Sequence, residues 1–194
     1  MSEDSPAKES SLISDRKCGT CTLCCKVMGI EEIAKPQGVW CPECQIGRGC
    51  KIYEKRPAEC QAFYCGYRSW PVLGEHWFPA KSKMVVVSEL AGTRIAIHMD
   101  PGRAGAWREE PFFSEIKNWS KMAAAQMHQV VVCIGKQAIV IFPDREVDLG
   151  QVADDERIMS VETRTAGGLK LDAIKLKADD PRLAGKDVGK VHVV

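Results

Sequence analysis

The cysteines of this chain are crowded into its first third. Nine of the ten lie between Cys18 and Cys65, and the tenth is Cys133. In chain order the nine are Cys18, Cys21, Cys24, Cys25, Cys41, Cys44, Cys50, Cys60 and Cys65. Thiols at this density form disulfides, bind metal or act as reactive groups, and each alternative predicts a different protein.

The beginning of the sequence indicates a reducing compartment. Residues 1–17 mix charged side chains with serines and contain no apolar stretch of the kind that a secretory signal requires. We therefore expect a disordered tail over 1–17 and a cytoplasmic protein. Structural disulfides are rare in the cytoplasm, so the clustered thiols are expected to hold metal, with redox-active dithiols as the alternative.

The spacing of the cysteines is typical of metal sites. Two Cys-x-x-Cys pairs separated by roughly 15 to 20 residues are typical of a four-thiolate zinc site. Cys41 and Cys44 form one such pair. The other is either Cys18 with Cys21 or Cys21 with Cys24, and the spacing does not choose between these registers.

The remaining thiols predict a second site. Adjacent residues rarely direct both side chains at one ion, so we expect Cys24 and Cys25 to serve different sites. Cys50, Cys60 and Cys65 then belong to the second site, together with Cys25 and the thiol left over from the first. All nine cysteines are candidate metal ligands, one more than two closed tetrahedral sites require. The ninth bridges two ions, stays a free nucleophile or simply packs.

Iron is the alternative to zinc. Cys18-x2-Cys21-x2-Cys24 repeats the first three positions of a bacterial ferredoxin motif, although the fourth cysteine is out of place. Thiolates suit both zinc and iron–sulfur clusters, so the ligands do not discriminate between them. Nine basic and five acidic side chains between Arg16 and Arg68 offset part of the thiolate charge. We expect zinc as the cofactor, or else iron or an iron–sulfur cluster.

Two stretches resemble a known bacterial family. Residues 18–26 read CGTCTLCCK and residues 49–65 read GCKIYEKRPAECQAFYC. The double cysteine and the element Cys-x-Ile-Tyr-x-x-Arg-Pro-x-x-Cys are similar to those of the bacterial cysteine-cluster proteins, described as a zinc- or iron-chelating domain. The resemblance covers residues 18–68 and implies metal binding through the cysteines. Flagellin lysine methylases look similar in having a cysteine cluster, which adds iron–sulfur chemistry and methyl transfer as implied alternatives.

The residues after the cysteine block predict three antiparallel hairpins. Apolar or alternating runs are separated each time by a glycine-containing turn. The paired runs are 84–90 with 93–99, 130–134 with 138–142, and 157–164 with 169–177. The first hairpin is expected to have the two-residue loop Ala91-Gly92. His98 is expected to be exposed, because it lies on the strand face opposite Ile95 and Ile97. The alternation of the last run slips at Ala173, which predicts a bulge.

One main helix is expected over 111–127. Phe112, Ile116, Trp119 and Ala123 recur there at spacings of three or four, which gives the helix one apolar face. Pro111 suits the first helical position. The aromatic-rich segment 63–79 before the first hairpin is expected to be a buried connector, with a ligand-stacking surface as the alternative.

The sequence therefore predicts an α+β protein. A small, metal-ordered, cysteine-rich N-terminal module is followed by a two-layer α/β domain with antiparallel hairpins and one main helix. The expected boundaries are 1–17 for the disordered tail, 18–68 for the cysteine module, 69–79 for an aromatic linker, 80–178 for the α/β domain, and 179–194 for a flexible tail.

Several functions find no support in the sequence. The formal net charge is +1, which disfavours nucleic acid and anionic membranes as partners. No apolar run approaches the roughly 20 residues needed to cross a bilayer. Catalytic motifs are absent, so enzymatic activity is left open. Cys133 is expected to be a core thiol, and His76 to be packed or solvated, although it is close enough in sequence to reach the cluster.

We therefore expect a metal-binding protein that holds zinc or iron through up to nine thiolates, in a structural or metal-handling role. The metal ion is the only expected partner that can be named. The first alternative is an iron–sulfur redox or methyl-transfer enzyme. The second is a zinc-ribbon nucleic-acid binder.

Overall fold

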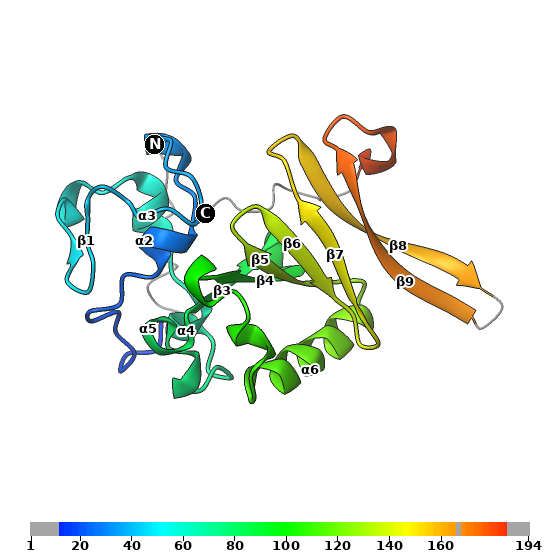
Figure 1. Ribbon diagram of the computed structural model, residues 1–194, viewed down its shortest axis with the longest axis horizontal. Helices are drawn as coiled ribbons and strands as arrows, with labels where there is room; N and C mark the ends of the chain where they lie inside the picture. Colours follow the sequence, from blue (N-terminus) through cyan, green and yellow to red (C-terminus); the bar gives the residue numbers. More distant parts are fainter. Residues whose placement is uncertain (1–11, 166–167, 186–194) are drawn as a thin grey trace.

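The chain builds a five-stranded sheet that is covered on both faces (Figure 1). A long helix and the aromatic segment before the sheet cover one face, and the cysteine-rich module and a long hairpin pack on the other. The structure is a computed structural model and describes residues 12–165 and 168–185. Helices and strands are mixed, which confirms the predicted α+β class.

The central sheet has the strand order β3-β4-β5-β6-β7. Its strands are β3 (Met84–Glu89), β4 (Arg94–Met99), β5 (Gln129–Ile134), β6 (Gln137–Ile141) and β7 (Glu146–Gln151). The first two predicted hairpins are confirmed as the antiparallel pairs β3–β4 and β5–β6. The parallel pairing of β4 with β5 was not predicted, and it is possible because the intervening helix carries the chain back across the sheet.

The loop of the first hairpin is longer than predicted. It contains four residues, from Leu90 to Thr93, and includes the short helix η4 (Leu90–Gly92). Leu90 and Ala91 both have φ of 51° and Gly92 has φ of 96°. The Thr93 amide and hydroxyl both donate to the Leu90 carbonyl, and these bonds hold the loop in its left-handed conformation. The expected two-residue loop is therefore wrong.

Helix α6 (Phe112–Ala124) covers one face of the sheet. It is the predicted main helix, and Ile116 on its apolar face is fully buried. Trp77 and Trp107 fill the same core and are also buried. Trp77 belongs to the aromatic segment before β3, and its indole donates to the Glu115 carboxylate on α6. Large aromatic rings therefore join that segment to the helix.

The opposite face of the sheet packs against the cysteine-rich module. Leu23, Val27 and Met28 of the module are buried in one core with Val85, Val131 and other sheet residues. Three thiol-bearing side chains pack against this same core, namely Cys21, Cys24 and Cys65. The module is therefore attached to the sheet through its cysteine-bearing segments.

The cysteine-rich module and the segment after it consist of very short elements. They are α2 (Cys24–Val27), η1 (Glu31–Ile33), β1 (Cys44–Gln45), β2 (Gly49–Cys50), η2 (Tyr53–Lys55), α3 (Ala58–Ala62), α4 (Gly66–Ser69), η3 (Glu75–Trp77) and α5 (Pro79–Ser82). After β4 come η5 (Pro101–Arg103) and η6 (Ala106–Arg108). No helix of the module reaches the length at which helices become stable by themselves.

The third predicted hairpin is confirmed as β8 (Glu156–Thr165) and β9 (Gly168–Lys177). Its register is unbroken from Glu156–Lys177 to Thr165–Gly168, so the bulge expected at Ala173 is wrong. The apolar and polar residues of β9 do not alternate strictly, because both faces of the hairpin are covered and both therefore carry apolar side chains. Ala173 packs in the core that the sheet shares with the cysteine-rich module, whereas Leu176 packs on Met159 and on Leu183 of η7 (Pro181–Leu183).

Parts of both predicted tails make contacts. The Ile13 amide donates to the Arg68 carbonyl at 2.9 Å, and Arg16 donates to the carbonyls of Tyr67 and Trp70. Leu183 is buried beneath the long hairpin. Residues 1–11 and 186–194 of the predicted tails lie outside the described residues.

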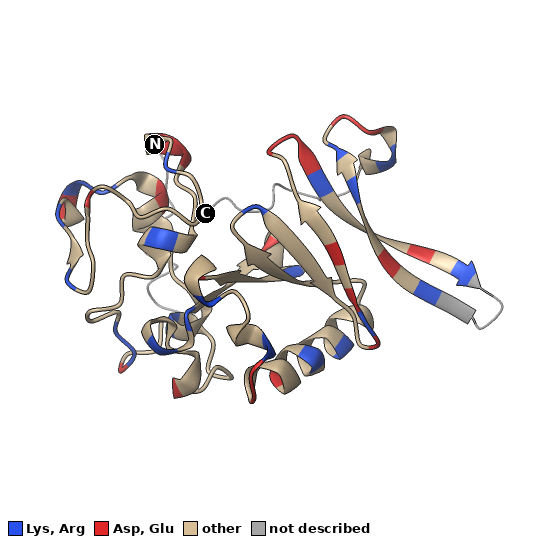
Figure 2. Cartoon of the chain, in the orientation of Figure 1, with Lys and Arg blue, Asp and Glu red and all other residues tan. Residues whose placement is uncertain are grey.

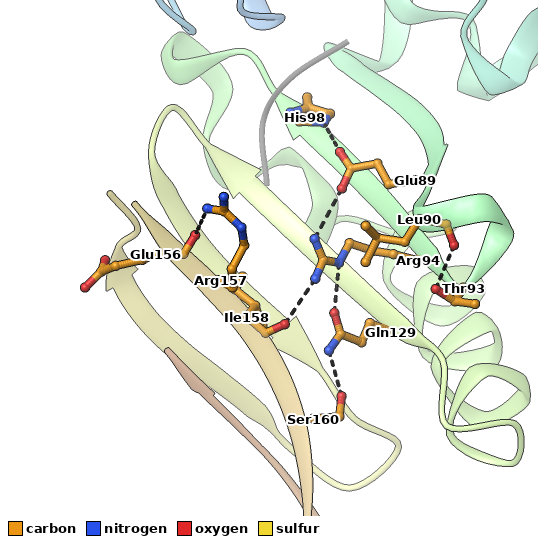
Figure 3. A network of polar contacts seen from close by, with 10 residues as sticks. All are labelled: Glu89, Leu90, Thr93, Arg94, His98, Gln129, Glu156, Arg157, Ile158 and Ser160. Atoms are coloured by element: carbon orange, nitrogen blue, oxygen red, sulfur yellow. Dashed lines mark hydrogen bonds and ion pairs between the residues drawn. The ribbon is translucent and has the colours of Figure 1, made fainter. Parts of the chain in front are cut away.

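A buried polar network crosses the sheet toward the long hairpin (Figure 3). Arg94 is fully buried and donates through Nε to Gln129 at 2.8 Å, through Nη2 to the Ile158 carbonyl, and through Nη1 to Glu89 at 3.5 Å. Glu89 also contacts His98 Nε2 at 3.4 Å. His98 is only 2% exposed. The expectation of an exposed His98 is wrong because the core on this face covers it.

Candidate metal centre

All nine predicted ligands lie around one cavity of about 440 Å³. They come from four separate stretches of chain. Cys18 and Cys21 precede α2, which carries Cys24 and Cys25. Cys41 precedes β1, whereas Cys44 lies in β1 and Cys50 in β2. Cys60 lies on α3, and Cys65 directly precedes α4. The short elements of the module thus direct thiols that are distant in sequence toward one space.

Turns and strand pairing fix the local position of several thiols. The amide of Cys21 donates to the Cys18 carbonyl at 2.8 Å, and Cys44 donates to Cys41 at 3.0 Å, so both Cys-x-x-Cys segments form tight turns. Cys44 lies directly opposite Cys50 in the β1–β2 pair. Opposite residues of a strand pair place their side chains on the same face, and therefore these two thiols share one face.

One set of thiols surrounds Cys65. Burial, together with the neighbouring thiols of Cys18 and Cys21, raises the pKa of Cys65 to about 11 against the opposing effect of backbone amides. Burial also raises the pKa of Cys21. The Arg68 guanidinium lies 3.5 Å from Cys18 Sγ, where it can donate to a thiolate.

A second set surrounds Cys25. Hydrogen bonds from the Cys24 and Cys44 thiols lower the pKa of Cys25 to about 6, against the effect of burial. Burial raises the pKa of Cys44 and of Cys60 to about 11, and Cys25 and Cys41 act on both in the same direction. The contact between Cys24 and Cys25 places them where the two sets meet.

Sequence reasoning missed a buried lysine beside the second set. Lys35 is only 5% exposed, and its ammonium donates to the carbonyls of Lys26 and Met28 at the end of α2. Burial lowers the pKa of Lys35, and nearby thiolates such as Cys25 and Cys41 oppose this effect. Its backbone also pairs with Ile30 through two hydrogen bonds. A single lysine in a loop is usually exposed to solvent, so nothing in the sequence predicts that Lys35 is buried.

The cysteine sulfurs are suitable donors for a soft metal, but they are not arranged closely enough to coordinate one ion. Within residues 12–165 and 168–185, no three Cys, His, Asp or Glu side chains are arranged so that they could hold a metal ion. Thiolate sulfurs bind zinc at about 2.3 Å, so the sulfurs of either set must approach each other for an ion to bind. The ligand chemistry is therefore suitable, whereas a closed site is not preformed.

The other candidate residues lie away from the cavity. His76 contacts the Glu115 carboxylate on α6 at 2.9 Å and does not line the cavity, as expected for a packed histidine. Cys133 is 1% exposed in the core of the sheet, which confirms the predicted core thiol.

Comparison of the chain with protein-family models, with curated proteins and with solved structures finds no match. The resemblance to the bacterial cysteine-cluster family therefore rests on residues 18–26 and 49–65 alone. Among the helices of the described ranges, none is both long enough and apolar enough to cross a bilayer.

Proposed function

We propose that this chain is a metal-binding protein that holds zinc or iron, the latter also as an iron–sulfur cluster, through its cysteine cluster. The observation that carries the proposal is the lining of one cavity by all nine cysteines, although they come from separate segments. Thiolates are soft donors that favour Cu(I), zinc and iron–sulfur clusters, and a tetrahedral set of four thiolates is typical of zinc and iron–sulfur. The role of the metal is structural or metal handling.

We infer two sets of ligands from the neighbours of each thiol. The first contains Cys18, Cys21, Cys24 and Cys65; the second contains Cys25, Cys41, Cys44, Cys50 and Cys60. Four thiolates complete a tetrahedral site, and the second set has one more than it needs. This division differs from both registers that the spacing offered, because Cys18 and Cys21 have Cys65 as a neighbour.

Two cations near the thiols support occupancy. Arg68 contacts Cys18, and the buried Lys35 lies near the thiols of the second set. Metal sites require deprotonated ligands, and fixed positive charges favour the thiolate form. The metal in turn supplies the cross-links that order a segment with few apolar contacts of its own.

Anaerobic purification followed by metal analysis and a visible spectrum tests the proposal. Zinc gives a colourless protein, whereas an iron–sulfur cluster gives a brown one. We expect at least one zinc or one cluster per chain. A folded protein that contains neither metal when it is freshly isolated contradicts the proposal.

Serine variants test the ligand sets. Cys21→Ser and Cys60→Ser each remove one ligand from a different set, so each is expected to lower the metal content. Cys133→Ala is the matched control, because this thiol lies in the core of the sheet and does not line the cavity. Full metal content in both serine variants shows that the assignment of ligands is wrong.

A further inference from the structure

The cavity has a wall that thiols do not form. Besides the cysteines, aromatic and aliphatic side chains line it, among them Tyr53, Phe63, Tyr64, Phe78 and Ile52. Its volume of about 440 Å³ includes the space between the thiols of both ligand sets, so only the part beside the apolar side chains counts toward a further ligand. A bound ion occupies only the centre of its own sulfurs. The apolar wall is therefore free to contact a ligand other than the metal.

Three arginines on this wall have no acidic partner. Arg48, Arg56 and Arg68 line the cavity together with one carboxylate, Glu43, and none of the three arginines forms an ion pair within the ranges that the structure describes. Elsewhere in the fold, acidic and basic residues are interspersed along the chain (Figure 2). Arg103, for example, pairs with Glu109 at 3.1 Å on the surface.

The arginines differ in what they contact. Arg68 lies beside Cys18 and is thus engaged by a thiol. Arg56 stacks on the Tyr53 ring, with Cζ 4.0 Å from the ring centroid, and donates only to the Tyr53 carbonyl. Tyr53 is 60% exposed and Arg48 is exposed as well, so this part of the wall forms the opening of the cavity.

We propose that the cavity of the metal-loaded protein binds a small organic anion with an apolar or aromatic body. Arg56 and Arg48 hold the anionic group at the opening, and the body of the ligand packs against Tyr53 and Ile52. A guanidinium recognises a planar or tetrahedral anion through paired N–H donors, and stacking on a ring holds it in one orientation. The inference rests on the proposed function, since it assigns a ligand to the same site.

A fluorescent anion and its neutral analogue test this inference. Anilinonaphthalene sulfonate has an aromatic body and a negative charge, whereas phenyl-naphthylamine has nearly the same body without the charge. Both are titrated into metal-loaded wild-type protein, the double variant Arg48→Met/Arg56→Met, and the control Arg103→Met. Arg103 is an exposed arginine outside the cavity.

We expect the double variant to bind the sulfonate at least tenfold more weakly, because it lacks the charged hydrogen bonds, each of which contributes roughly 1.5 to 3 kcal/mol. Binding of the neutral analogue and binding by Arg103→Met are expected to stay within about twofold of wild type. Arg56→Lys keeps the charge without the paired donors and is expected to fall between the two.

Metal content measured in each sample separates the two proposals. Unchanged sulfonate affinity in a double variant with full metal content contradicts the anion site and leaves the metal proposal standing. Equal losses for the charged and the neutral probe also contradict it, since these show a general collapse of the cavity. Absence of metal from the wild-type protein overturns the proposed function itself.

Discussion

Arg94 lies at the centre of the buried polar network that joins the sheet to the long hairpin. Its guanidinium is fully buried and joins Gln129, the Ile158 carbonyl and Glu89. Removal of one partner from a buried charge pair leaves the other charge poorly compensated. Arg94→Met is therefore expected to lower the free energy of unfolding by about 3 to 5 kcal/mol, measured by guanidinium chloride denaturation.

The double variant Glu89→Gln/Arg94→Met shows whether charge is the cause, because it neutralises both partners. It is expected to recover part of the lost stability. Arg103→Met removes an exposed arginine and is expected to change the free energy of unfolding by less than about 1 kcal/mol. If Arg94→Met behaves like Arg103→Met, the network does not stabilise the fold.

At the scale of single residues, the sequence predicts the candidate metal ligands, because few residue types can bind metal. It does not predict which polar side chains are buried by packing against distant segments. Cysteine spacing identified all nine cysteines that line the cavity, and an apolar run identified Cys133 as buried. His98 and Lys35 were not recognised as buried. Burial of a polar side chain depends on which distant segment covers it, and periodicity within one strand or loop does not contain that information.

Among the elements, one ion pair joins the cysteine-rich module to the sheet. Lys26 Nζ on α2 lies 2.6 Å from Asp100 Oδ1 directly after β4. Burial tends to raise the pKa of Asp100, but the bonds from Lys26 and the Gly102 amide lower it below its ordinary value. A carboxylate with a lowered folded-state pKa stabilises the protein above its unfolded-state pKa, and this stability is lost as the pH falls toward the folded-state pKa.

Asp100→Asn is therefore expected to lower the free energy of unfolding at pH 7 by about 1 to 2 kcal/mol. The difference from wild type shrinks as the pH falls below the ordinary carboxyl pKa of 3.8. Urea denaturation across this range measures it. Asp154→Asn is the control, because that side chain is 83% exposed. An equal effect of both variants at pH 7 excludes a special role for the Lys26 contact.

Local patterns predicted the elements better than their pairing. The three hairpins and α6 follow from alternation and helical spacing, both of which act over a few residues. The parallel pairing of β4 with β5 depends on where α6 returns the chain, and β7 combines Val147 and Leu149 with charged neighbours at the edge of the sheet. The bulge expected at Ala173 is absent because both faces of β9 are covered.

For the whole molecule, the proposed metal is expected to order the cysteine-rich module and not the five-stranded sheet. The cysteine-rich module contributes Leu23, Val27 and Met28 to the core, and its helices and strands have five residues or fewer. The sheet has a full core on each face. Without metal, the module therefore lacks enough buried apolar surface to offset its conformational entropy.

Hydrogen exchange before and after treatment with a chelator measures this difference. Amides of residues 18–68 are expected to lose protection when the metal is removed. Amides of β3 are expected to lose part of their protection, because Val85 and Val87 pack in the core that the sheet shares with the module. Amides of β5 and β6 are expected to keep their protection. Zinc is expected to restore protection, whereas magnesium, which prefers oxygen ligands, is not.

If residues 18–68 stay protected in the metal-free protein, packing alone orders the module, and a structural role for the metal is wrong. If all amides lose protection together, the module and the sheet fold as one cooperative unit, and the metal stabilises the molecule as a whole.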